Sequence, residues 1–242
     1  MPNETGDMKI TGNFRRLIDF VIPDALYAPT NSNVAIVNLE AGLAAAIAAV
    51  ADIGVKLAPN KFAINARQDA YIAAVALIRG SRNILKSSGA SAQTLADADT
   101  FTRKIFGVRK SKKVEDDPNT PANEAEQNHS ASQRSYDAVL GNIRSYIQIV
   151  SNEPLYDPTE ARFKIAALTA LADDLEAKNN AVSTTFVPVN SARILRDELL
   201  YTGATCLCNL AQMVKAYVRA VHGATSPFYK TVNALSFKRS RR

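Results

Sequence analysis

The stretch NFRRLIDFVIPDALYAPTNSNVAIVNLEAGL, residues 13–43, returns 129 positions later as NIRSYIQIVSNEPLYDPTEARFKIAALTALA, residues 142–172. The two stretches align without a gap, and eleven of the 31 positions are identical, including LYxPT in both. Chance would supply roughly two identities, so the match indicates an internal repeat. The fold of the whole chain then depends on what one repeat contains.

Shorter and less similar segments extend the repeat toward the end of each half. KFAINAR (61–67) resembles FVPVNSAR (186–193), and SSGAS (87–91) resembles VHGAT (221–225). Between the halves, VEDDPNTPANEAEQNHSASQRS (114–135) is rich in Asp, Glu, Asn, Ser and Pro and has no apolar periodicity, which is typical of a polar linker. The sequence therefore predicts a first repeat over 1–113, an acidic linker over 114–136 and a second repeat over 137–242.

Apolar residues recur at helical spacing almost throughout the chain, and Gly and Pro number only ten each. We therefore expect an all-α fold, an internally duplicated helical bundle with about four helices per repeat. Two like units favour a pseudo-twofold arrangement, although one fused core is an open alternative. The expected helices are 11–22, 31–56, 65–88 and 93–106 in the first repeat, and 137–150, 159–181, 191–221 and 227–236 in the second.

The repeated LYxPT predicts a joint between two helices, because the residue before a proline favours an extended conformation. In the second copy, DPTE (157–160) has the pattern of a capping box with Pro158 at the first helical position, whereas Thr30 or Asn31 would cap in the first copy. The Leu and Tyr of each copy are expected to pack on the core. The structural repeat motif comprises Leu26, Tyr27, Pro29, Thr30, Leu155, Tyr156, Pro158 and Thr159.

Two further expectations concern the second repeat. TTFVPVN (184–190) is locally strand-like without a partner strand, so it predicts an extended connection. The helix that follows should run to Gly223, with an apolar stripe that includes Leu195, Cys206 and Met213 buried along one face.

Catalytic and metal-binding motifs are scarce in the sequence. It contains no glycine-rich phosphate loop, no His-Glu-x-x-His and no Gly-x-Ser-x-Gly, and its two histidines are His129 and His222. Glu126 and His129 form a single Glu-x-x-His in the linker, whereas a di-iron bundle needs two. Cys206 and Cys208 are predicted to be buried, inert thiols. We therefore expect no catalytic residue, no metal and no cofactor, although an enzyme with a site between the two halves remains a minor alternative.

The N-terminus and the length of the charge-free stretches predict the cellular compartment. The polar N-terminus MPNETGDMKITGN lacks the apolar core of a secretory signal, and the longest charge-free stretches, 41–51 and 199–214, are shorter than a membrane-spanning helix requires. We expect a cytoplasmic protein that does not contact a membrane.

Two functions fit these observations. The leading expectation is a non-enzymatic helical interaction or structural protein, such as a scaffold, adaptor or assembly component, that presents a pseudo-symmetric surface to a protein partner. The alternative is a nucleic-acid-binding module, because the chain carries a net charge of +6 and each repeat ends in a basic cluster that would attract phosphates. The candidate anion-contact residues are Arg109, Lys110, Lys112, Lys113, Lys238, Arg239, Arg241 and Arg242. The protein partner and the oligomeric state do not follow from the sequence.

Overall fold

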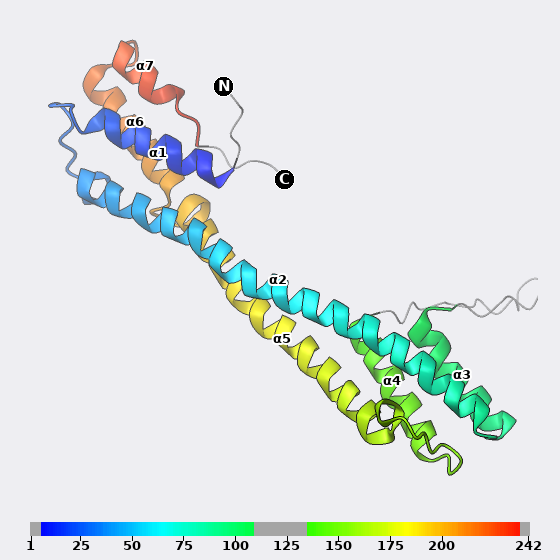
Figure 1. The fold of residues 1–242 in the computed structure, drawn as a ribbon. Coiled ribbons are helices and arrows are strands. Elements are labelled where there is room, and N and C mark those ends of the chain that lie inside the picture. The colour runs from blue at the N-terminus through cyan, green and yellow to red at the C-terminus, as the bar shows by residue number, and fades with distance from the viewer. Residues whose placement is uncertain (1–5, 109–134, 238–242) are drawn as a thin grey trace, which may run out of the picture. The chain divides into compact units, whose positions relative to one another are not determined.

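The computed structural model describes residues 6–108 and 135–237, and every regular element within them is a helix (Figure 1). The prediction of an all-α fold is therefore confirmed. These residues divide into two compact units, each of which is described by itself. Unit 1 comprises the described residues of Met1–Lys61 and Thr185–Arg242, and unit 2 comprises those of Phe62–Thr184.

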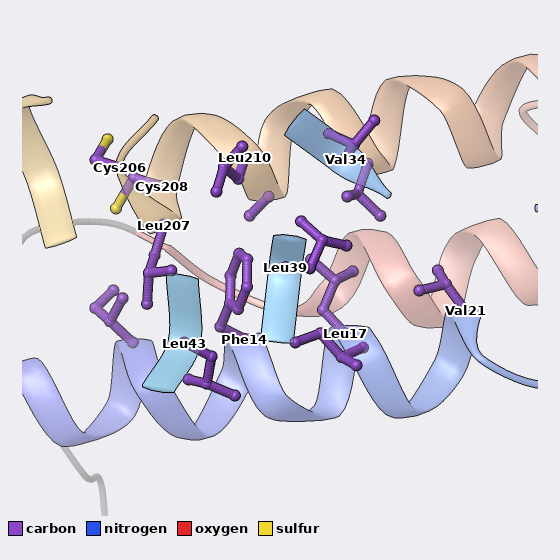
Figure 2. Packing of buried hydrophobic residues seen from close by; sticks show 14 of the residues in the cluster. Phe14, Leu17, Val21, Val34, Leu39, Leu43, Cys206, Leu207, Cys208 and Leu210 are labelled. Atoms are coloured by element: carbon purple, nitrogen blue, oxygen red, sulfur yellow. The ribbon is translucent and has the colours of Figure 1, made fainter. Parts of the chain in front are cut away.

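Unit 1 is built from both ends of the described chain. Its core is one cluster of apolar side chains in which Phe14, Leu17, Leu39 and Leu207 are fully or almost fully buried (Figure 2). Its elements are α1 (Asp7–Val21), η1 (Ser32–Val34), the first part of α2 (Ile36–Ser87), the last part of α5 (Ile165–Asp197), the π-helical turn η3 (Glu198–Thr202), α6 (Leu207–His222) and α7 (Pro227–Ala234).

Unit 2 is formed by the middle of the chain. It combines the second part of α2 with α3 (Ala92–Phe106), α4 (Tyr136–Ser151), η2 (Ala161–Phe163) and the first part of α5. Helices α3 and α4 pack against each other. The cluster that holds the unit together includes the buried side chains Ile78, Leu85, Ile143, Tyr146, Leu168 and Leu175.

The two units do not follow the division expected from the repeat. Within the described residues, each unit takes helices from both sequence halves, whereas the sequence analysis expected a separate up-and-down bundle in each half. The reason lies in α2 and α5, which were expected to break near residues 56–65 and 181–191. Both continue as helices through an internal proline, Pro59 and Pro188. An interior proline costs roughly 3 kcal/mol, which the hydrogen bonds and side-chain packing of a long helix can offset.

The expected extended connection at 184–190 is wrong, because these residues belong to α5. The chain instead leaves the α-helix after Asp197, passes through η3 and starts α6 at Leu207. Gly203 makes this break possible, since a Cβ added there would lie 2.8 Å from the Glu198 carbonyl oxygen. The predicted stripe over 191–221 is consequently interrupted, and Leu195 and Met213 are exposed.

The predicted helix ends at Ser226, Gly223 and Gly89 are confirmed. Ser226 accepts a hydrogen bond from the Tyr229 amide, and Pro227 is the first residue of α7. Helix α6 ends before Gly223, whose φ of 82° lies in the left-handed region that glycine adopts at little cost. Gly89, with φ 84°, follows the end of α2 in the same way.

Both LYxPT segments lie between helices, as predicted, but the capping box is wrong. Helix α5 begins only at Ile165, after the short turn η2. In the first copy, the Asn31 side chain accepts a hydrogen bond from the Asn33 amide and caps η1. The tyrosines pack on the core as expected, whereas Leu26 and Leu155 are 55% and 54% exposed and lie outside the core clusters. Of the other motif residues, Pro158 is buried, Pro29 is half-buried, and Thr30 and Thr159 are exposed.

The two segments share their local geometry. The Tyr27 hydroxyl donates to the Val34 carbonyl oxygen at 2.7 Å, and the Tyr156 hydroxyl donates to the Phe163 carbonyl oxygen at 2.8 Å. Both bonds span seven residues, and their members lie 129 positions apart. Matching positions also begin matching elements: α1 and α4, η1 and η2, and α2 and α5 each start 129 residues apart, and Pro59 and Pro188 have the same separation.

Candidate interaction surfaces

The basic clusters that the sequence singles out lie outside the described residues. Nothing in the structure bears on their contacts, so anion binding by these side chains stays a prediction. They are Arg109, Lys110, Lys112, Lys113, Lys238, Arg239, Arg241 and Arg242.

A row of large apolar side chains faces solvent on the part of α5 that belongs to unit 1. Phe186, Val187, Ile194 and Leu195 are between 48% and 62% exposed. The pair Phe186 and Val187 lies two helical turns, or seven to eight residues, before the pair Ile194 and Leu195. This spacing places both pairs on one face of the helix, opposite the buried Val189 and Ala192. We call these four residues the α5 row. Sequence reasoning missed it because residues 184–190 were expected to be extended, and only a helix brings the two pairs onto one face.

Unit 2 contains a groove of about 530 Å³ between α2, the end of α3 and the start of α4. Its floor, meaning the buried and half-buried lining residues, is apolar and aromatic, and its exposed lining residues include both apolar and charged side chains. The lining consists of Gln68, Tyr71, Ile72, Val75, Ala76 and Arg79 from α2, Lys104 and Ile105 from α3, and Tyr136 and Val139 from α4.

The two charged residues that line this groove are both cationic, and the Asp137 carboxylate lies next to it, bonded to the same Asn179 amide as Tyr71. Arg79 and Lys104 are exposed members of the lining, and no carboxylate is among the lining residues. The Arg79 guanidinium lies 5.0 Å from the centre of the Phe106 ring, and the Arg67 guanidinium lies 3.9 Å from that of Tyr136. These cation–π contacts hold guanidinium groups beside the apolar floor without neutralising them.

Hydrogen bonds hold the floor of the groove in place. The Tyr71 hydroxyl donates to the Tyr136 carbonyl oxygen at 2.9 Å, and the Asn179 side-chain amide donates to the Tyr71 oxygen at 3.0 Å and to Asp137 at 2.9 Å. Burial raises the pKa of Tyr71, so its hydroxyl is neutral at physiological pH. The arrangement links α2, α4 and α5 and makes the groove a preformed surface.

Unit 1 has a second hollow of about 530 Å³, on α6 and α7, whose charged lining residues are Lys215 and Arg219. The Lys215 ammonium is already engaged there. It donates to the carbonyl oxygens of Asn233, at 3.0 Å, and Leu235, and burial lowers its pKa. Lys215 therefore ties the end of α7 to α6 and serves as a structural contact.

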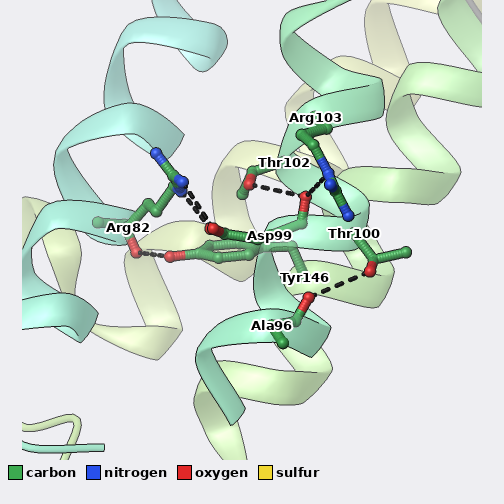
Figure 3. A network of polar contacts seen from close by, with 8 residues as sticks. Arg82, Ala96, Asp99, Thr100, Thr102, Arg103 and Tyr146 are labelled. Carbon is green, nitrogen blue, oxygen red and sulfur yellow. Dashed lines mark hydrogen bonds and ion pairs between the residues drawn. The ribbon is translucent and has the colours of Figure 1, made fainter. Parts of the chain in front are cut away.

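Buried polar groups in unit 2 form a chain of hydroxyls. Ser81 Oγ lies 2.8 Å from the Tyr146 hydroxyl and 2.6 Å from that of Tyr156. Burial raises the pKa of both tyrosines, so these groups act as neutral hydrogen-bonding partners. Next to them, Arg82 and Asp99 form a two-pronged ion pair, with 2.8 Å between Nη2 and Oδ2 (Figure 3). The hydrogen bond from Arg82 lowers the pKa of Asp99. These contacts fasten α2 to α3 and α4.

The two cysteines are buried and unbridged, as predicted. The Cys208 thiol donates to the Phe237 carbonyl oxygen at 3.1 Å, and burial raises its pKa to about 11, which keeps it a neutral, unreactive thiol. His222 lies at the C-terminal end of α6, with Nε2 2.8 Å from the Asp24 carboxylate. Glu126 and His129 lie outside the described residues.

Residues 6–108 and 135–237 contain no group of three or more His, Cys, Asp or Glu placed to hold a metal ion. Helix α2 is long and apolar enough to cross a membrane by length and composition alone, with a mean hydropathy of 1.7 over its best 18 residues, of which 22% are buried. The charge-free stretch 41–51 lies within this helix. One such helix is weak evidence for a membrane span, since core helices of soluble proteins can have the same length and composition.

In comparisons with protein-family models, curated proteins and solved structures, nothing matches this chain significantly.

Proposed function

We propose that this protein is a non-enzymatic helical interaction or structural protein, a scaffold, adaptor or assembly component, that binds a protein partner through exposed apolar surface. The observation that carries this proposal is the α5 row. When a partner covers such a side chain, the removal of its apolar surface from water favours binding by roughly 25 cal/mol for every Å² covered. Clustered exposed side chains of this kind mark interaction sites more often than isolated ones do.

The test is affinity capture of the full-length protein from its own cells, with and without nuclease. We expect captured proteins to survive nuclease treatment and to be lost from a V187E/I194E variant. Val37→Glu is the matched control, because Val37 is also in unit 1 and is 68% exposed. Unchanged capture by V187E/I194E, or a measured turnover that one polar substitution abolishes, would contradict the proposal.

We further propose that the chain is an internal duplication with a pseudo-twofold arrangement of its repeats. The matching element starts and the paired tyrosine bonds support this. A reciprocal contact adds to it: Arg196 of the second half forms an ion pair with Asp7 of the first at 2.8 Å, and Arg67 of the first half stacks on Tyr136 of the second. Arg67 and Arg196 lie 129 positions apart, as do Asp7 and Tyr136.

On this proposal, each compact unit joins the N-terminal part of one repeat to the C-terminal part of the other. A crystal structure would test the duplication by superposition of residues 7–61 on 136–190. The same helix order with Tyr27 on Tyr156 is expected. Different surroundings for the two tyrosines would contradict it.

A second candidate function is nucleic-acid binding, favoured by the net charge of +6 and by the basic clusters at 109–113 and 238–242. Removing 238–242 and neutralising the four basic residues of 109–113 should weaken DNA or RNA binding and make its salt dependence shallower. Absence of binding by the intact protein at about 50 mM salt would end this candidate.

A further inference from the structure

We propose that the groove of unit 2 binds an acidic amphipathic helix of a protein partner. This inference rests on the proposed function as an interaction protein, and it adds a defined site and the chemistry of the segment that fills it.

The shape of the groove favours a helix. Its α2 wall is one continuous helical face, from Gln68 through Ile72 and Val75 to Arg79. Eleven residue steps at about 1.5 Å each give a wall roughly 16 Å long, which matches three turns of a docked helix. Ile72 is 64% exposed, so the groove is open along its edge to a large ligand. A helix laid in such a groove inserts apolar side chains spaced three and four residues apart.

The charge of the groove favours carboxylates on that helix. Arg79 on α2 and Lys104 on α3 stand on different walls, so a helix lying between them would pass both. Carboxylates flanking its apolar face could pair with both cations, and the groove lining carries no acidic side chain to repel them. A basic or neutral helix would leave Arg79 and Lys104 without a carboxylate partner, which gives the site a preference for acidic segments.

The aliphatic part of the lining distinguishes this site from one for nucleic acid. Ile72, Val75 and Val139 offer aliphatic surface, whereas single-stranded nucleic acid binds by stacking bases on exposed aromatic faces along a row of cations. The ring of Tyr136 is already covered by Arg67. The surface thus fits apolar side chains better than bases.

The experiment measures binding of fluorescent peptides to the full-length protein by polarisation. The probes are a panel of amphipathic helices with Leu at positions i, i+3, i+4 and i+7 and Glu on both flanks, each paired with a version in which Gln replaces Glu. We expect acidic members to bind about 10-fold more tightly than their Gln versions. We expect Ile72→Glu, and separately R79E/K104E, to weaken binding about 10-fold.

Matched controls separate the groove from the rest of the surface. K61E/R193E makes the same charge change at exposed positions outside the groove and should leave binding within twofold. V187E/I194E should also leave peptide binding unchanged, so the two proposals fail separately: loss of cellular partners tests the α5 row, and loss of peptide binding tests the groove. Circular dichroism and thermal unfolding verify that each variant is folded.

Three results would overturn the proposal. In one, no acidic peptide binds more tightly than its Gln version. In another, I72E and R79E/K104E bind as well as the unaltered protein. In the third, peptides bind only after Glu115, Asp116 and Asp117 are neutralised, which would identify this chain's own acidic stretch as the occupant.

Discussion

The hydroxyl of Tyr27 donates a 2.7 Å hydrogen bond to the carbonyl oxygen of Val34, and both side chains are buried in the core of unit 1. The bond closes the segment between α1 and α2. We predict that Tyr27→Phe destabilises the protein by about 1 kcal/mol, because the Val34 carbonyl loses its partner away from water. Tyr156→Phe should cost more, because that hydroxyl also contacts Ser81.

Urea unfolding followed by circular dichroism measures both effects. Tyr229→Phe is the control, since Tyr229 is only half-buried, and we expect its effect to stay within about 0.5 kcal/mol. Equal losses at Tyr27, Tyr156 and Tyr229 would show that the two buried bonds carry no particular weight.

Alkaline pH should unfold the protein through its buried tyrosines. Burial raises the pKa of Tyr27 from 10 to about 12, and burial also raises the pKa of Tyr71, Tyr146, Tyr156 and Tyr201. A phenol with a raised folded-state pKa contributes stability that is fully present below pH 10 and is lost as the pH rises toward 12. Ultraviolet absorbance of tyrosinate should therefore rise together with the loss of helical circular dichroism. Complete titration of all tyrosines near pH 10 in the folded protein would contradict this.

Gly80 and Gly54 form a matched pair on α2. A Cβ added at Gly80 would lie 2.7 Å from the Phe163 ring, whereas one at Gly54 meets nothing within 4 Å. We expect Gly80→Ala to destabilise the protein by about 1–3 kcal/mol through overpacking, and Gly54→Ala to stabilise it by about 0.5–1 kcal/mol through helix propensity. Thermal unfolding distinguishes the signs. The double variant G80A/F163L should recover part of the loss, and its failure to do so would locate the strain elsewhere.

The ion pair between Arg82 and Asp99 predicts a loss of stability in acid. Its hydrogen bond lowers the pKa of Asp99 below the ordinary 3.8, so the stabilisation is present above pH 3.8 and disappears as the pH falls through the lowered pKa. Asp99→Asn should cost about 1–2 kcal/mol at neutral pH, a modest value because both side chains are partly exposed. The variant should also lose less stability than the unaltered protein on acidification. Chemical denaturation at neutral and acidic pH measures the difference, and parallel losses in both proteins would contradict the assignment.

Local signals in the sequence predicted some helix ends, because a cap acts within one turn, but the capping box at 157–160 and the helix start expected at 191 are wrong. Ser226 with Pro227 and the glycines at 89 and 223 mark ends that the structure confirms. The position of Pro59 and Pro188 inside continuous helices could not be predicted from such local signals. A proline weakens any helix locally, and whether the helix continues depends on packing along its whole length, which involves residues far away in sequence.

The candidate surfaces were missed for a related reason. Leu195 has the spacing of a buried stripe, yet it is exposed. The expected stripe needs one continuous helix, but α5 ends two residues after Leu195 and the rest of the stripe continues on the separate helix α6. The groove of unit 2 joins Arg79, Lys104 and Tyr136 from three helices. No single stretch of sequence contains that combination, so it emerges only from the tertiary packing.

The discontinuous make-up of unit 1 has a consequence for biosynthesis. Unit 2 is one uninterrupted stretch, Phe62–Thr184, and all of its helices have been translated before α6 and α7 exist. The apolar face of α1, made first, must wait for the last helices to leave the ribosome before its core can close. Nascent chains stalled after residue 184 should accordingly resist protease over unit 2 while α1 remains cleavable, and chaperone binding should concentrate on that first helix.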